Sequence, residues 1–133
     1  MIGLDTNVLV RLLAGDDEAQ RAIARAYIER HASPSDPAFI DRIVLVETVW
    51  VLESVYAYSR AQISTAIDAL LRTVHFVIED SELARAALAL YRGGDDFADA
   101  AIVTTNVAYG CTRTATFDRK AAKRNSHFVA LSG

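Results

Sequence analysis

The residues of this chain that could do chemistry are carboxylates in apolar or helix-opening surroundings. They belong to Asp5, Glu47, Asp96, Asp99 and Asp118. Gathered in one site, such groups would repel one another by roughly 4 kcal/mol per pair at ~4 Å and an effective dielectric constant of about 20. A divalent cation removes this repulsion, and ligands made only of oxygen favour Mg²⁺ or Mn²⁺ over zinc. Ions of this kind activate water for phosphodiester hydrolysis.

Asp5 follows the apolar run Ile2–Leu4 and precedes Thr6. An apolar run that ends in a carboxylate predicts a strand that delivers an acidic group to the edge of a sheet, where open α/β sheets bind their ligands. Asp5 could instead cap the helix that follows it. The residue by itself does not separate the two interpretations.

Glu47 interrupts Ile43–Leu52, a run so apolar that a helix formed by it should be buried on nearly every side. A lone buried carboxylate costs several kcal/mol unless it is paired or neutralised. The alternative is a polar stripe that faces solvent and is shared with Glu53. Residues 47 and 53 lie on roughly opposite sides of a helix at ~100° per residue, so one stripe does not hold both. The pattern therefore favours a functional Glu47.

Asp96 and Asp99 follow Gly93-Gly94 at a spacing that places both on one face of a helix. Helix capping explains Asp95 and Asp96 well. It explains Asp99 less well, because the alanines around it predict close packing. Asp118 follows a strand candidate as Asp5 does, although alone it is an ordinary turn aspartate. Acids that follow two strands and open or line two helices can converge at one edge of a parallel sheet.

Short strands that alternate with longer helices must position these acids. We expect strands near residues 2–4, 39–43, 75–78, 112–116 and 128–131, and helices over 6–13, 16–31, 44–58, 59–71, 80–92 and 95–107. This alternation predicts βαβ units and a mainly parallel sheet that helices cover on both faces. Residues 1–133 are expected to form one domain, because no linker, repeat or low-complexity tract divides them.

Composition places the chain among soluble globular proteins, with 52% hydrophobic and 23% charged residues. The single cysteine, Cys111, suits a reducing cytosol, and no signal peptide or membrane-spanning run is visible, so we expect a cytoplasmic protein with no membrane partner. A net charge of −3 argues against a general nucleic-acid coat protein. Five basic residues between Arg113 and Arg124 could nevertheless suit a phosphate-bearing substrate, or simply form a solvated face.

The acidic motifs resemble those of the PIN-domain ribonucleases, and more closely those of the VapC toxins of bacterial toxin–antitoxin pairs. The resemblance rests on Leu4–Asn7, Val46-Glu47, Asp96–Ile102 and Thr116–Asp118, in order and at normal spacing. It implies a three-layer α/β/α sandwich around a central, mainly parallel sheet. It also implies an endoribonuclease that depends on Mg²⁺, for which Mn²⁺ would substitute.

By the same resemblance, Asp5 and Asp99 would be the principal metal ligands, and helix capping would fall to the neighbours of Asp5. Glu47 would complete an acidic triad by binding the metal or orienting the attacking water. Asp118 would be a fourth acid, and Asp96 would join the pocket. These roles make all five carboxylates candidate catalytic residues.

Other residues and partners also follow from the resemblance. Thr6, Asn7 and Thr116 would orient the carboxylates by hydrogen bonding, whereas Asp41 stands where a small polar residue is expected and the pattern does not account for it. The substrate would be RNA, and the chain would form a homodimer. A cognate VapB-type antitoxin would lay an arm into an apolar groove, often with a basic residue in the acidic pocket.

Two other classes of protein compete with a nuclease. A phosphatase or phospho-receiver with an aspartyl nucleophile also has an Asp after its first strand. The former needs a second Asp where this chain has Asn7, and the latter needs paired acids and a late lysine that do not fit. A PIN-like scaffold could instead hold RNA or a partner without cutting, although it has no need of four mutually repelling carboxylates. Metal binding separates these readings.

Overall fold

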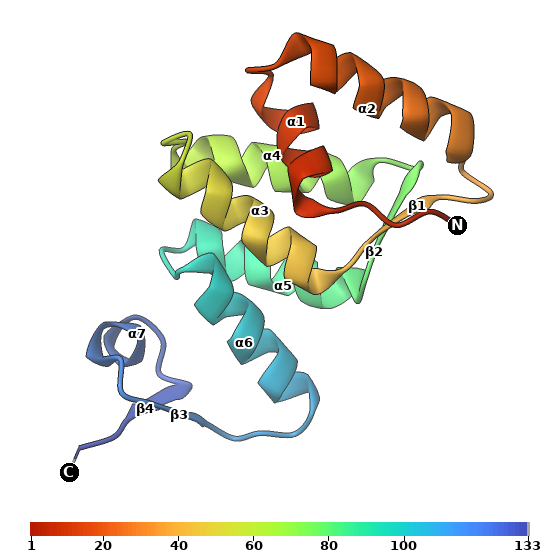
Figure 1. Cartoon of the computed structure of the whole chain (residues 1–133). Helices are drawn as coiled ribbons and strands as arrows, with labels where there is room; N and C mark the ends of the chain where they lie inside the picture. Colours follow the sequence, from red (N-terminus) through yellow and green to blue (C-terminus); the bar gives the residue numbers. More distant parts are fainter. Residues whose placement is uncertain (133) are drawn as a thin grey trace. The chain divides into compact units, whose positions relative to one another are not determined.

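The chain forms two compact units, residues 1–81 and the residues from Glu82 onward. The computed structural model describes residues 1–132, so Gly133, at the end of the expected domain, lies outside the described residues. Figure 1 shows the helices and strands of both units along the chain. Each unit contains helices and one pair of parallel strands, so the chain has the helix-rich α/β fold with parallel strands that the sequence predicts.

The first unit begins with a short segment that pairs with a strand. Its elements are α1 (Thr6–Ala14), α2 (Glu18–His31), β1 (Ala38–Ile40), α3 (Arg42–Ser54), α4 (Arg60–Arg72) and β2 (Phe76–Ile78). Strands β1 and β2 are parallel and pair Ala38 with Phe76. Gly3 bridges to Phe39 in parallel, and the Leu4 N–H donates to the Phe39 carbonyl at 3.0 Å. The predicted strand at residues 2–4 is therefore one bridge long, and it leads directly into Asp5.

Local signals in the sequence fix the helix ends of this unit. Gly15 ends α1 with a left-handed φ of 67°, a conformation that glycine adopts without strain. Asp17 begins α2 by accepting a hydrogen bond from the Gln20 N–H. Ser59 and Gln62 begin α4 with a reciprocal capping box. The helices then bury their apolar faces in a core whose largest members include Leu9, Ile40, Leu52, Ile63 and Ile67.

Helix α3 differs from the expected helix over 44–58. It runs from Arg42 to Ser54, so Ile43 belongs to the helix and not to the preceding strand. The helix begins early because the Asp41 carboxylate accepts a hydrogen bond from the Val44 N–H at 2.8 Å. It ends early because the chain turns at Ala57, whose φ is 54°. Capping thus explains Asp41, which the sequence pattern left without an account.

Replacing Asp41 with alanine is expected to lower the free energy of unfolding by about 1 kcal/mol, because α3 loses its N-cap. Asp41→Ser should lower the free energy of unfolding by only about a few tenths of a kcal/mol, because the serine hydroxyl can also accept a hydrogen bond from the Val44 N–H. Urea unfolding of the three proteins measures the difference. Equal stability of the alanine and wild-type proteins would contradict this role.

The second unit places a short helix between two parallel strands. Its elements are α5 (Ser81–Arg92, of which Ser81 closes the first unit), α6 (Phe97–Ala108), β3 (Thr114–Thr116), α7 (Arg119–Arg124) and β4 (Phe128–Ala130). Strands β3 and β4 pair Thr114 with Phe128, and α7 joins them. Val103, Ala121 and Phe128 form a small buried cluster under this βαβ unit. Over residues 1–132, no helix is long and apolar enough to cross a membrane.

Candidate active site

Asp5 stands where the N-terminal segment passes into α1, and it is exposed. It is the N-cap of that helix, and its Oδ1 accepts a hydrogen bond from the Thr6 N–H at 2.8 Å. The expectation that capping falls to its neighbours is therefore wrong, because the carboxylate of Asp5 itself does this. One oxygen suffices for the cap, which leaves Oδ2 able to bind a ligand.

Thr6 connects Asp5 to the second acid of this unit. The Thr6 hydroxyl donates to Glu47 Oε1 at 3.2 Å, from α1 across to α3. Thr6 therefore bonds one of the predicted acids, and that this acid belongs to a functional site stays a prediction. Asn7 is exposed beside the pair, and within residues 1–132 its side chain has no hydrogen bond to either carboxylate.

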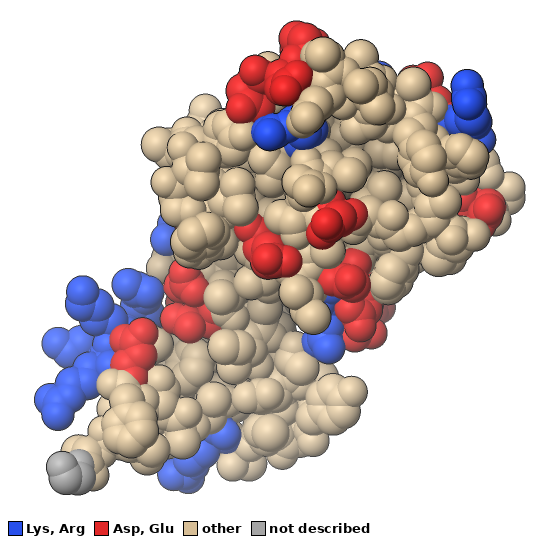
Figure 2. Space-filling view, viewed as in Figure 1, with Lys and Arg blue, Asp and Glu red and all other residues tan. Residues whose placement is uncertain are grey.

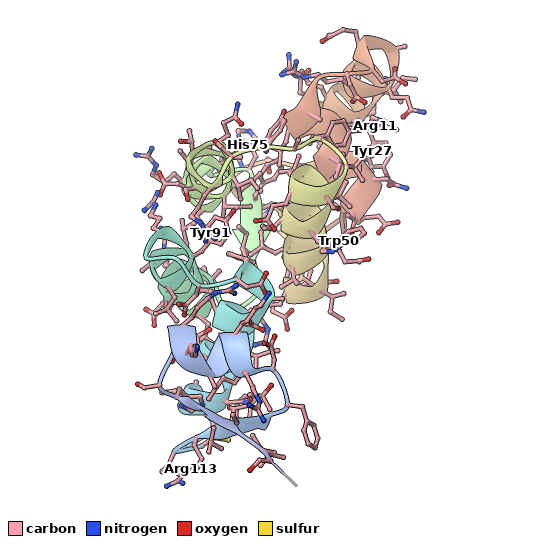
Figure 3. All side chains as sticks on the ribbon, turned by 90° about the vertical axis from the view of Figure 1, so that its left-hand side faces the viewer. Arg11, Tyr27, Trp50, His75, Tyr91 and Arg113 are labelled. Carbon is pink, nitrogen blue, oxygen red and sulfur yellow. The ribbon has the colours of Figure 1, made fainter. Side chains whose placement is uncertain are left out.

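Glu47 is exposed, which contradicts the expectation of a buried carboxylate. Helix α3 has one buried face, and its opposite face carries Glu47 between two apolar side chains. These are Ile43, 73% exposed, and Trp50, 64% exposed; Figure 3 shows Trp50 on the outer side of α3. The apolar pattern predicted burial on every side because Ile43 and Trp50 are apolar although they lie on the surface. Burial therefore does not distinguish Glu47 from an ordinary surface carboxylate.

A pocket of about 300 Å³ opens beside this acid pair. Asp5, Thr6 and Glu47 line one part of it, and Arg11 and Tyr56 line another. The Arg11 guanidinium donates to the Tyr56 hydroxyl at 3.0 Å, and this hydrogen bond is the main cause of a raised Arg11 pKa. In the first unit, two carboxylates, Asp5 and Glu47, therefore line one pocket, and Arg11, held by its hydrogen bond to Tyr56, lines the same pocket.

The second unit holds the other three candidate acids at helix starts. Asp96 caps α6, since its Oδ2 accepts the Asp99 N–H at 3.1 Å. Asp118 caps α7, since its Oδ1 accepts the Lys120 N–H at 2.9 Å. The Thr116 hydroxyl accepts the Asp118 N–H at 2.9 Å, so Thr116 positions this acid through its backbone.

The fold disfavours ionisation of Asp99. Partial burial raises its pKa first, the charges of Asp96 and Asp118 raise it further, and Arg124 opposes them. Asp99 lies in the first turn of α6, and no donor within the described residues bonds its carboxylate. The charges of Asp96, Asp118 and Asp95 therefore all act on Asp99. Arg124 also acts on Asp99, and in the sequence it stood out only as the end of the basic run that begins at Arg113.

Asp95, unlike its neighbour Asp96, does not cap a helix. It is buried, and its Oδ2 accepts a hydrogen bond from Asn125 Nδ2 at 2.8 Å. Asn125 Oδ1 in turn accepts the His127 N–H at 2.9 Å. Asp95 thus ties the start of α6 to the end of α7, and its role is structural.

The donor chemistry fits a hard divalent cation, because every candidate ligand is a carboxylate oxygen. A cation near Asp99 would also offset the repulsion that raises its pKa. Over residues 1–132, neither unit by itself gathers three acidic, histidine or cysteine side chains closely enough to hold an ion. A shared site would need acids from both units, and their convergence at one sheet edge stays a prediction.

Comparison with known protein families matches residues 2–126 to the PIN domain. The chain belongs to the PIN-domain family. A VapC ribonuclease of Aquifex aeolicus (strain VF5) is 30% identical to this PIN domain over 88 residues. That alignment covers 66% of this chain and 64% of the relative, less than two thirds of the relative's length. The PIN match crosses from the first unit into the second, so all five acids lie within it.

Proposed function

We propose that this PIN domain is a divalent-metal-dependent endoribonuclease and the toxin of a VapBC-type pair. The observation that carries the proposal is the placement of Asp96, Asp99 and Asp118 at the starts of α6 and α7, in a chain of the PIN family similar to a VapC ribonuclease. The raised pKa of Asp99 is consistent with it. Carboxylates that repel one another are costly unless they serve a cation. Both units would belong to one PIN domain acting in the cytoplasm, where RNA is the substrate.

Asp5 and Asp99 would hold the ion, Mg²⁺ or Mn²⁺ in its place. When bound, the ion would supply activation of water and neutralisation of charge at the scissile phosphate. Glu47, which Thr6 holds by a hydrogen bond of 3.2 Å, would orient the attacking water and accept its proton. Asp118, fixed at the start of α7, would support this water or a further ion, and Asp96 would fix the first turn that carries Asp99. The products would carry 3′-hydroxyl and 5′-phosphate ends.

The antitoxin would bind next to this site. A groove of about 580 Å³ lies between α1 and α2, and its wall includes two exposed apolar side chains, Ile23 at 70% and Tyr27 at 52%. Asn7 and Arg11 line both this groove and the pocket beside Asp5. A peptide arm seated in the groove would therefore reach the acidic pocket by passing Asn7, which explains how a VapB-type antitoxin would inhibit cleavage. The toxin would act as a homodimer.

Removal of the metal provides the direct test of a nuclease. Purified protein is expected to cut single-stranded RNA in Mn²⁺ or Mg²⁺, and excess EDTA should lower the rate by at least about a hundred-fold, since the acids alone do not activate water. Addition of Mn²⁺ beyond the EDTA should restore the rate. Gel analysis of end-labelled RNA measures both steps. Undiminished cleavage in EDTA would refute the metal-dependent mechanism.

A further inference from the structure

Helix α7 concentrates positive charge that the fold itself does not use. Its cations, all exposed, are Arg119, Lys120, Lys123 and Arg124. Figure 2 shows Lys and Arg gathered over α7. Within residues 1–132, no carboxylate lies within ion-pair distance of them, and Arg124 lowers the pKa of Asp99 through its charge. Like charges four residues apart on a helix repel and lower its stability. The arrangement is therefore better explained by an anionic partner than by a contribution to folding.

A pocket of about 450 Å³ lies beside these cations in the same unit. Arg119 and Lys123, one turn apart on α7, line it together with Ala122 and with Ala130 and Leu131 at the end of β4. Two cations over an apolar floor can hold a phosphate and the flat face of a base at the same time. The volume lies within the ordinary range of small-ligand pockets.

An exposed aromatic side chain, Phe117, directly precedes Asp118 in the chain, whereas the cations of α7 follow it. Phe117 is 81% exposed, between the end of β3 and the start of α7. Single-stranded nucleic acids bind by stacking bases on such side chains, whatever the base, while cations track the backbone. A candidate catalytic acid, Asp118, is thus flanked in the chain by a stacking residue and by a cationic pocket.

We propose that Phe117 and the pocket of Arg119 and Lys123 form a binding subsite for single-stranded RNA. The subsite holds the nucleotides next to the phosphate that is cut, one stacked on Phe117 and one seated between α7 and β4. It reads the backbone and the flat faces of bases, so it adds affinity without strong sequence preference. The inference rests on the proposed ribonuclease function and names the surface that takes the substrate.

The test measures binding without cleavage. Protein with the background change Asp99→Asn, in EDTA, is titrated against a fluorescent single-stranded RNA of mixed sequence at a series of salt concentrations. Adding Arg119→Gln and Lys123→Gln should raise Kd about ten-fold near ~0.1 M salt and reduce the slope of log K against log salt by about 1.4, since two phosphate contacts are lost. Adding Phe117→Ala should raise Kd about five-fold or more and leave that slope unchanged.

The matched control removes the same charge elsewhere. Arg25→Gln with Arg30→Gln changes two exposed cations of α2 and should alter Kd by no more than about two-fold. Thermal melting confirms that each variant folds. Unchanged RNA affinity in the α7 variant, or an equal loss in the α2 control, would overturn the subsite and leave α7 to an acidic protein surface or to solvent.

Failure of the subsite and failure of the nuclease give different results. RNA binding that depends on α7 in a chain that never cuts RNA would refute the proposed function and retain the subsite. Metal-dependent cleavage together with unchanged RNA binding in the α7 variant would support the proposed function and refute the subsite. In the active background, the α7 variant should raise KM and leave kcat unchanged, because its cations do not touch the reacting atoms.

Discussion

Replacing Asp99 with asparagine is expected to abolish metal binding and to slow RNA cleavage by at least about a hundred-fold. Loss of a residue that only supports a metal ligand already costs 10–100-fold in general, so loss of a ligand should cost more. The protein should remain folded. Partial burial, and then the charges of Asp96 and Asp118, raise the pKa of Asp99, so its ionised form destabilises the native chain above the ordinary Asp pKa. A neutral amide removes that destabilisation.

Asp5→Asn, a change in the first unit, should likewise abolish metal binding and slow RNA cleavage. Asparagine can still accept the Thr6 N–H and cap α1, so the change removes charge and not the fold. The matched control is Asp68→Asn, which breaks only a surface ion pair with Arg72 and should leave cleavage unchanged. Single-turnover cleavage of labelled RNA in Mn²⁺ measures all three. Activity within ten-fold of wild type in either site variant would remove that acid from the site.

The largest effect on stability is expected from Phe97→Ala. Phe97 is 1% exposed, begins α6, and packs edge to face on Tyr91 with ring centroids 5.7 Å apart. Truncation of a buried phenylalanine leaves a cavity and costs about 3–5 kcal/mol. Because Asp99 lies in the same first turn of α6, cleavage should also fall.

Phe117→Ala is the matched control, since it makes the same chemical change at a side chain that is 81% exposed. Its free energy of unfolding should stay within about 0.5 kcal/mol of wild type. Urea unfolding followed by circular dichroism compares the two variants. A loss below about 1 kcal/mol in Phe97→Ala would show that this aromatic pair does not hold the second unit together.

Most helix ends were predictable because short-range signals determine them. Ser59 with Gln62, Asp17 with Gln20, and Gly15 each act within about one turn, so the residues that make the contact are neighbours in sequence. The fold class followed from the same local information, since short strands between helices imply parallel pairing.

The burial of α3 was not predictable from its apolar pattern. Periodicity reports the burial of a helix only when apolar side chains avoid its surface, and Ile43 and Trp50 are exposed. The prediction that Glu47 is a buried carboxylate is therefore wrong, because Glu47 is exposed. What distinguishes it in the structure is the hydrogen bond from Thr6, 41 residues away, which no local pattern contains.

Residue type and sequence context predict the candidate acids, whereas contacts between distant parts of the chain distinguish their individual roles. Asp95 and Asp96 are adjacent and identical in kind, yet one bonds Asn125, 30 residues on, and the other caps α6. Partial burial and then the charges of Asp96 and Asp118 raise the pKa of Asp99, while Arg124 at the end of α7 opposes them, so the shift depends on residues about 20 positions further along the chain. Long-range contacts of this sort decide which carboxylate is structural and which is available to a ligand.

Thermal melting with and without Mn²⁺ tests most directly the proposal that acids of both units serve one metal ion. At a concentration about 100 times Kd, Mn²⁺ should stabilise the wild-type protein by about 2.7 kcal/mol, a rise in Tm on the order of 5–10 °C. Asp5→Asn and Asp99→Asn should each abolish this rise, and Asp68→Asn should retain it. A full Mn²⁺-dependent rise in either Asp5→Asn or Asp99→Asn would show that the two units do not share the ion.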